Sequence, residues 1–200
     1  AGAGSFNYGT EIIEDNTAPR GFINFPGPDG AADLLLSTHL NLFWVDISET
    51  AQSVKHRISY QNSEGSYTGK LAIAPDNRSC WFTDGDQIGR FRWADTSGSI
   101  DVKRFGPGVT SQTDPFYEGV PIEKYGFVTD ISFSKQNPNW LYVSIGGLAA
   151  SRNAYIRIFD ISIERWLGGD IVKNSTAKRA YTNIWDKIFT VGTTALFVSD

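Results

Sequence analysis

A unit of short apolar segments separated by polar turns recurs along this chain, and that recurrence constrains the fold more than any other feature. The clearest copy has apolar segments at 71–74, 80–83, 87–93 and 100–105. Short segments of this kind, bounded by Gly, Pro, Asn and Asp, are typical of β-strands. Each copy of the unit therefore predicts a small antiparallel sheet of four strands.

Similar units flank this copy on both sides. One spans 21–60, another spans 127–167, and a fourth begins with segments at 184–191 and 195–199. Their first strands start at or beyond the upper end of the roughly 40–50-residue spacing of known propeller blades, so the blades are expected to carry inserted loops. We therefore predict an all-β fold, a β-propeller with about three complete blades and a partial fourth.

The domain organisation follows from these units. We expect an N-terminal extension or closing strand at 1–20, followed by propeller blades over 21–200. The blades are assigned to about 21–60, 69–106, 127–167 and 183–200. Propellers usually contain four to eight blades. The absence of Met and the partial fourth blade therefore favour a segment of a larger ring.

The best copy of the unit resembles the β-propeller superfamily with short NHL, YVTN or SMP-30-like repeats. In those repeats an apolar strand with a Pro-Asp turn leads to an aromatic strand and then to an Ile-x-x-Phe strand. Segments 71–76, 81–86 and 88–91 match this pattern. The resemblance is strongest over 71–105 and 127–162. It implies the fold and leaves the function open, because this fold carries many unrelated functions.

Composition excludes several classes of partner. The net charge is −4 with Lys and Arg scattered, so there is no basic stripe for a phosphate backbone, and we expect no nucleic-acid partner. No apolar segment approaches the roughly 20 residues needed to span a bilayer. The single Cys80 excludes an internal disulfide. A single cysteine fits a reducing compartment and does not exclude others. As the location of the protein, we favour an extracellular or virion-associated one over the cytoplasm.

One face of the predicted propeller collects the long insertions. In a propeller, the turns between strands two and three share a face with the connections to the next blade. In this chain those positions hold 61–69, 106–126, 146–153 and 168–183, whereas opposite turns such as 75–79 are short. Loops held by a rigid scaffold are the usual place for binding. We therefore expect the binding site on this face.

Polar and aromatic residues of this face form the candidate binding set. The set consists of His39, Asp84, Asp86, Phe116, Tyr117, Glu118, Tyr125, Arg152 and Asn153. Asp84 and Asp86 flank a glycine, so they could ligate a hard cation such as Ca²⁺, or form an ordinary Asp-Gly turn. His39 could be a base or metal ligand, or a turn histidine. Phe116, Tyr117 and Tyr125 could bind sugars or a protein, or pin their own loop.

Two functions remain open on this basis. The first is a non-enzymatic structural or binding module within a larger assembly, of which a virion or tail is one kind. It would have protein or oligomeric partners, could bind carbohydrate and would need no cofactor. The second is a divalent-cation-dependent hydrolase or lyase like SMP-30 or virginiamycin B lyase, with Asp84, Asp86 and Glu118 as first candidates. No residue matches the motifs of those enzymes in context, so the sequence favours the first function.

Overall fold

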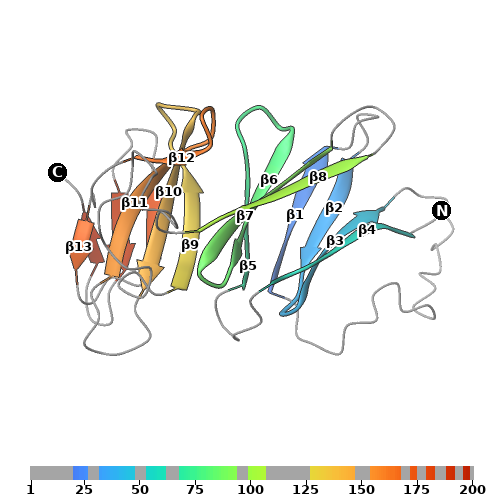
Figure 1. The fold of residues 1–200 in the computed structure, drawn as a ribbon, viewed down its shortest axis with the longest axis horizontal. Helices are drawn as coiled ribbons and strands as arrows, with labels where there is room; N and C mark the ends of the chain where they lie inside the picture. The colour runs from blue at the N-terminus through green and yellow to red at the C-terminus, as the bar shows by residue number, and fades with distance from the viewer. Residues whose placement is uncertain are drawn as a thin grey trace, which may run out of the picture.

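The chain folds into consecutive antiparallel sheets that stand in a row. The computed structural model describes residues 20–26, 32–47, 53–61, 68–93, 99–106, 127–146, 154–167, 172–174, 179–182, 188–191 and 196–198. Within these residues every regular element is a β-strand, and Figure 1 shows the first, second and third sheets beside one another. The all-β class and the propeller-blade pattern are therefore confirmed. The predicted extension at 1–20 lies outside the described residues, apart from Arg20.

The first two sheets are complete four-stranded blades with strands in chain order. The strands of the first are β1 (Gly21–Pro26), β2 (Ala32–Ser37), β3 (Asn41–Asp46) and β4 (Ser53–Ser59). Those of the second are β5 (Thr68–Ile73), β6 (Ser79–Asp84), β7 (Gln87–Trp93) and β8 (Ile100–Phe105).

The third sheet has a divided outer strand. Its inner strands are β9 (Phe127–Phe133), β10 (Trp140–Gly146) and β11 (Ala154–Asp160). Both β12 (Arg165–Trp166) and β13 (Val172–Asn174) pair with β11, at opposite ends of it. Together they occupy the position that β4 and β8 hold in the first two sheets.

The fourth sheet differs from the expectation. Its strands are β14 (Arg179–Thr182), β15 (Ile188–Val191) and β16 (Leu196–Val198). The segment expected as the first strand, 184–191, therefore contributes the second strand, and the sheet begins before residue 183. The physical reason is that β14 is short and half polar, so it has little of the apolar alternation by which a strand is recognised.

Residue type explains the turns that join these strands. Asp84 pairs with Gln87, so β6 and β7 are joined by Gly85 and Asp86 alone. Gly85 has φ of 69°, as expected for the first central residue of a type II′ turn, which suits the twist of a hairpin. The turn from β5 to β6 holds Asn77 at φ of 57°, a conformation that Asn tolerates better than most residues.

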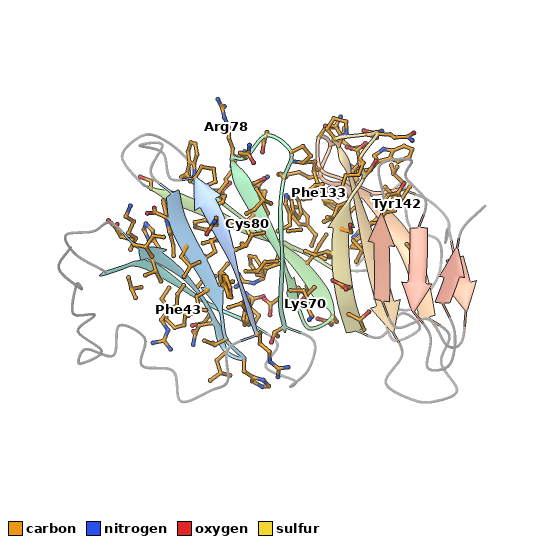
Figure 2. All side chains as sticks on the ribbon, turned by 180° about the vertical axis from the view of Figure 1, so that it is seen from behind. Phe43, Lys70, Arg78, Cys80, Phe133 and Tyr142 are labelled. Atoms are coloured by element: carbon orange, nitrogen blue, oxygen red, sulfur yellow. The ribbon has the colours of Figure 1, made fainter. Side chains whose placement is uncertain are left out.

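The cores lie between neighbouring sheets rather than within one. Between the first and second sheets, Phe25, Leu35 and Trp44 pack against Cys80, Phe82 and Phe91, and Figure 2 shows Cys80 in this layer. Between the second and third, Trp81 and Ile88 pack against Ile131, Val143 and Phe159. The first strands β1, β5, β9 and β14 contact one another in succession. No helix in the described part of the chain is long and apolar enough to span a membrane.

Candidate functional site

The face predicted to bind is built around the turns at 38–40 and 85–86. We call it the long-loop face, and we include in it the adjoining ends of β4, β5 and β8. Figure 2 shows the opposite ends of the second sheet, with Lys70 near the long-loop face and Arg78 on the opposite turn. Of the nine candidate residues, the described ones are His39, Asp84 and Asp86. The others lie outside the described residues, namely Phe116, Tyr117, Glu118, Tyr125, Arg152 and Asn153.

Asp84 is buried and joins two sheets. Its side chain is 0% exposed. The backbone N–H of Gln61 donates to its two carboxylate oxygens at 2.9 and 3.1 Å, and Arg104 Nε donates to Oδ2 at 2.8 Å. Arg104 Nη2 also donates to the carbonyl oxygen of Ser59 at 2.8 Å. Asp84 therefore connects β6 to β8 and to the end of β4 in the first sheet.

Asp86 has a different environment from Asp84, although only Gly85 separates them. It is the second residue of the turn and is only partly buried. Among the described residues, no group of three or more His, Cys, Asp or Glu side chains is placed to hold a metal ion. The Ca²⁺ site therefore stays a prediction from sequence, with Asp86 as the more accessible of its two carboxylates.

His39 lies in the turn between β2 and β3, and a neighbouring cation orients its ring. Arg20 Nη2 lies 2.6 Å from His39 Nδ1. Since a guanidinium can only donate, Nδ1 accepts and the ring proton of the neutral imidazole is on Nε2. Thr68 Oγ1 donates to the His39 carbonyl at 3.0 Å. The backbone of His39 thus joins the first sheet to the second.

The turn that carries His39 is fixed by Thr38. The Thr38 hydroxyl accepts from the backbone N–H groups of Leu40 at 3.3 Å and Asn41 at 3.1 Å. The Thr38 N–H donates to the Asn41 carbonyl at 2.8 Å. A Thr side chain that bonds to the backbone two and three positions later stabilises a turn without help from other elements. The turn at 38–40 is therefore held in part by its own residues, whereas the turn at 85–86 is held through Asp84 by residues of other elements.

Several residues that organise this face were missed by sequence reasoning. The buried hydroxyl groups of Ser37 and Tyr60 lie 2.6 Å apart and share a hydrogen bond. A Cβ on Gly69 would lie 2.0 Å from Ser37 Oγ, so this glycine lets β5 approach β2 closely. Arg104 and Gln61 were missed as well. Their sequence context is that of an ordinary strand and an ordinary loop residue, so no local signal marks them.

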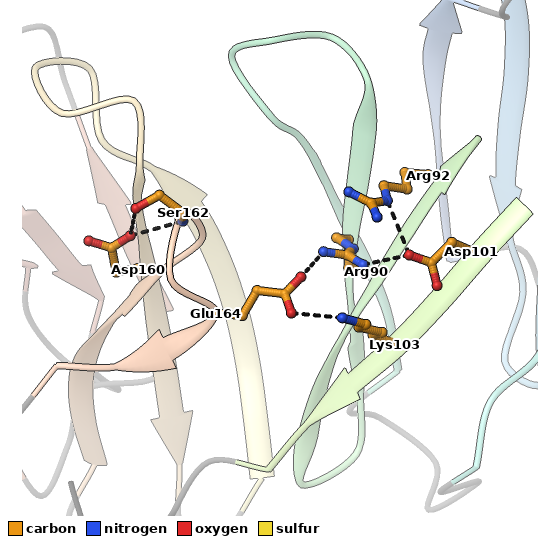
Figure 3. Close-up of polar contacts among 7 residues, drawn as sticks. All are labelled: Arg90, Arg92, Asp101, Lys103, Asp160, Ser162 and Glu164. Carbon is orange, nitrogen blue, oxygen red and sulfur yellow. Dashed lines mark hydrogen bonds and ion pairs between the residues drawn. The ribbon is translucent and has the colours of Figure 1, made fainter. Parts of the chain in front are cut away.

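A second set of charges joins the sheets near the opposite face (Figure 3). Glu164, in the turn from β11 to β12, forms ion pairs with Arg90 and Lys103 of the second sheet. Arg90 also donates to Asp101 at 2.7 Å. Burial, and then the charge of Arg92, lower the pKa of Arg90 from its ordinary value, whereas Asp101 raises it. Glu164 has φ of 54°, so the backbone bears a small cost at the residue that makes these contacts.

Comparison with known proteins supports the fold. No protein-family model matches the chain, and no curated protein matches it. The calcium structure of a Trichoderma reesei carbohydrate-active enzyme of family AA12 matches with a TM-score of 0.51 and 17% identity, over 92% of this chain and 48% of that chain. A putative 6-phosphogluconolactonase from Bacteroides fragilis matches with a TM-score of 0.50 and 14% identity, over 91% of this chain and 56% of that chain.

These likenesses concern β-propeller proteins, and they confirm the predicted fold. Identities this low carry the fold alone, because the same propeller scaffold supports unrelated sites. The chain spans about half the length of the structures that it matches.

Proposed function

We propose that this chain is a non-enzymatic β-propeller module that binds a protein partner through its long-loop face. The observation that carries the proposal is the position of Asp84, which is buried and bonded to Gln61 and Arg104. A catalytic or metal-binding carboxylate has to reach substrate or metal, whereas this one joins two sheets. Asp84 and the turn fixed by Thr38 together hold the ends of the first two sheets in place, so that these ends form a rigid support for the loops.

A rigid support of this kind suits recognition. Binding residues are held most precisely when the segments that carry them are fixed by satisfied contacts of their own. His39 and Leu40 stand on such a turn, and Leu40 is an exposed hydrophobic residue. A partner that covers this turn would bury Leu40 and meet the polar groups around it. A module of this type fits a component of a larger assembly, of which virions and tails are one class.

Site-specific photo-crosslinking tests the proposal. A photo-crosslinking amino acid replaces Leu40 on the long-loop face, or Arg78 on the opposite turn as the matched control. Both positions are exposed and lie in turns. In an extract of the source organism, we expect position 40 to capture a defined protein, unlabelled chain to compete with that capture, and position 78 to capture none. Equal labelling at both positions, or no labelling at either, would contradict the proposal.

The alternative function, a cation-dependent hydrolase or lyase, has its own signature. The matched structures include the calcium structure of a carbohydrate-active enzyme of family AA12 and a putative 6-phosphogluconolactonase. A ligand that binds only the folded state raises the melting temperature. Thermal unfolding with Ca²⁺, Mg²⁺ or Zn²⁺ therefore gives the readout. A rise that Asp86→Asn removes would favour the enzyme, whereas no rise with any of the three ions would favour the binding module.

A further inference from the structure

Three buried hydrogen-bond donors of the core between the second and third sheets have no acceptor among the described residues. They are the indole N–H groups of Trp81 and Trp166 and the Nε–H of Arg90. The three residues are 1%, 6% and 5% exposed, so bulk water does not reach these donors. Since the great majority of buried N–H groups in proteins are paired, three such donors in one core indicate an acceptor from outside the described chain.

These donors lie close together around the ring of Phe159. Trp81 of β6 pairs with Arg90 of β7 in the strand register, so both side chains lie on the same face of the second sheet. The ring centres of Trp81 and Trp166 lie 5.4 and 5.2 Å from that of Phe159. Glu164, two residues before Trp166, bonds to Arg90 (Figure 3). The three donors therefore gather where β12 meets the second sheet.

The indole groups next to the other core have acceptors. Trp44 Nε1 donates to Asp33 Oδ2 at 2.6 Å, and Trp93 Nε1 donates to the carbonyl oxygen of Pro26 at 3.2 Å. Trp44 is as deeply buried as Trp81, at 1% exposed. Donors without a described acceptor are therefore a property of the core between the second and third sheets, and not of every buried indole group in this chain.

Charge at this core favours a negative acceptor. Among the described residues, the charged side chains buried here are both cationic, namely Arg90 and Arg157. The guanidinium of Arg157 lies 5.6 Å from the centre of the Trp166 ring. The carboxylates that pair with Arg90 are those of Asp101 and Glu164, whose side chains are more exposed, at 29% and 27%. Because Coulomb attraction is strong where water is excluded, an anion is favoured here over a neutral acceptor such as water.

Packing in the same core limits the size of the acceptor. The ring centre of Phe105 lies 4.8 Å from that of Phe159 and 5.7 Å from that of Trp81. Aromatic rings at these separations are in contact, so only a small acceptor fits beside them. We propose that this core binds one inorganic anion of about the size of chloride, held by Trp81, Trp166 and Arg90. The site uses no residue of the long-loop face and does not depend on the proposed function.

The indole signals in a proton–nitrogen correlation spectrum test the inference. Each of the six Trp residues gives one such signal, and replacing one Trp at a time by Phe assigns it. Sodium chloride replaces sodium gluconate, whose anion is too large for this core, at a constant ionic strength of about 0.15 M so that screening stays the same. We expect the signals of Trp81 and Trp166 to shift along one saturating curve. Those of Trp44 and Trp93 should stay in place, because their N–H groups already have acceptors.

Thermal unfolding in the same two salts is a second measurement. An anion that binds only the folded chain raises the melting temperature. We expect chloride to raise it above the value in gluconate, and Trp166→Phe, which removes one donor and keeps an aromatic ring, to remove most of this rise. The matched control is Trp93→Phe, since that indole donates outside this core, and it should keep the full rise. Circular dichroism of both variants establishes that the fold is retained.

Three outcomes would overturn the proposal. Signals of Trp81 and Trp166 that do not respond to chloride would instead favour N–H contacts with the face of the Phe159 ring. A shift shared by all four assigned signals would be a general salt effect. A chloride-dependent rise of equal size in Trp166→Phe and Trp93→Phe would place the bound anion elsewhere.

Discussion

At the scale of single residues, Cys80 shows how burial controls chemistry. It is the only cysteine of the chain, and it lies in β6, fully enclosed between the first and second sheets. Burial raises the pKa of its thiol, and a hydrogen bond to the backbone of Ala72 opposes this only in part. Since the thiolate is the reactive form, the thiol of the folded protein should be inert.

A pH dependence of stability follows. The folded state keeps the Cys80 proton when the unfolded state loses it, so this contribution is fully present below the unfolded pKa of about 8.5. It is lost as the pH rises above that value toward the raised pKa of the folded state. The free energy of unfolding should therefore fall above about pH 8.5, by up to about 1.4 kcal/mol per pH unit.

Urea unfolding between pH 7 and 10 measures this slope, with Cys80→Ala as the reference. The variant lacks the titrating thiol, so the difference between native chain and variant isolates it from Lys and Tyr, which titrate in both. Equal slopes for the two proteins would contradict the prediction. A thiol reagent gives a second reading, since Cys80 should react only when the two sheets open.

At the scale of single elements, β7 illustrates how closely strands pack within a blade. Gly89 lies opposite Phe82 of β6, and the Phe82 ring covers the space where a side chain would begin. A Cβ on Gly89 would lie 2.1, 2.2 and 2.7 Å from atoms of that ring. The absence of a side chain at this position is therefore what allows Phe82 to pack flat in the core between the first two sheets.

Gly89→Ala should consequently lower the free energy of unfolding by about 2 kcal/mol, within the usual range for overpacking a core. Gly21→Ala is the matched control, because a Cβ at Gly21, in β1, would meet nothing within 4 Å. Its effect should stay within about 0.5 kcal/mol. Chemical denaturation of both variants measures the two values. Equal effects would mean that the Phe82 ring can move aside at little cost.

At the scale of the whole molecule, charged residues connect successive sheets at both ends of the blades. Asp84 and Arg104 connect the first two sheets at the long-loop face. Glu164 connects the third sheet to Arg90 and Lys103 of the second near the opposite face. Each connection fixes the position of one sheet against the next. The apolar contacts between the sheets are not directional and would by themselves allow one sheet to slide over the other.

Asp84→Asn tests the first connection. The substitution removes the negative partner of Arg104, and both side chains of this ion pair are largely buried. The free energy of unfolding should therefore fall by about 3 kcal/mol, the lower end of the range for breaking a buried ion pair. Asp86→Asn, in the same turn, is the control and should change it by less than about 1 kcal/mol, as expected for a surface position. Urea unfolding of both variants gives the comparison. A larger loss for Asp86→Asn than for Asp84→Asn would contradict this assignment.

The sequence by itself determined the strands and the order of the blades. Apolar alternation and turn residues act between neighbours in the chain, so the sequence predicts the turn at Gly85 and the four-strand unit around it. The sequence does not mark β14, because a short strand with half-polar residues carries too little apolar alternation. The candidate set on the long-loop face likewise follows from the positions of its residues in the predicted blades.

Only the tertiary structure decided what the individual side chains do. Asp84 meets Gln61 and Arg104, which are 23 and 20 residues away in the chain, and the first of these contacts requires that two sheets pack on each other. No local pattern encodes such a contact. The ion pairs of Glu164 with Arg90 and Lys103 likewise join residues that are 74 and 61 positions apart in the chain.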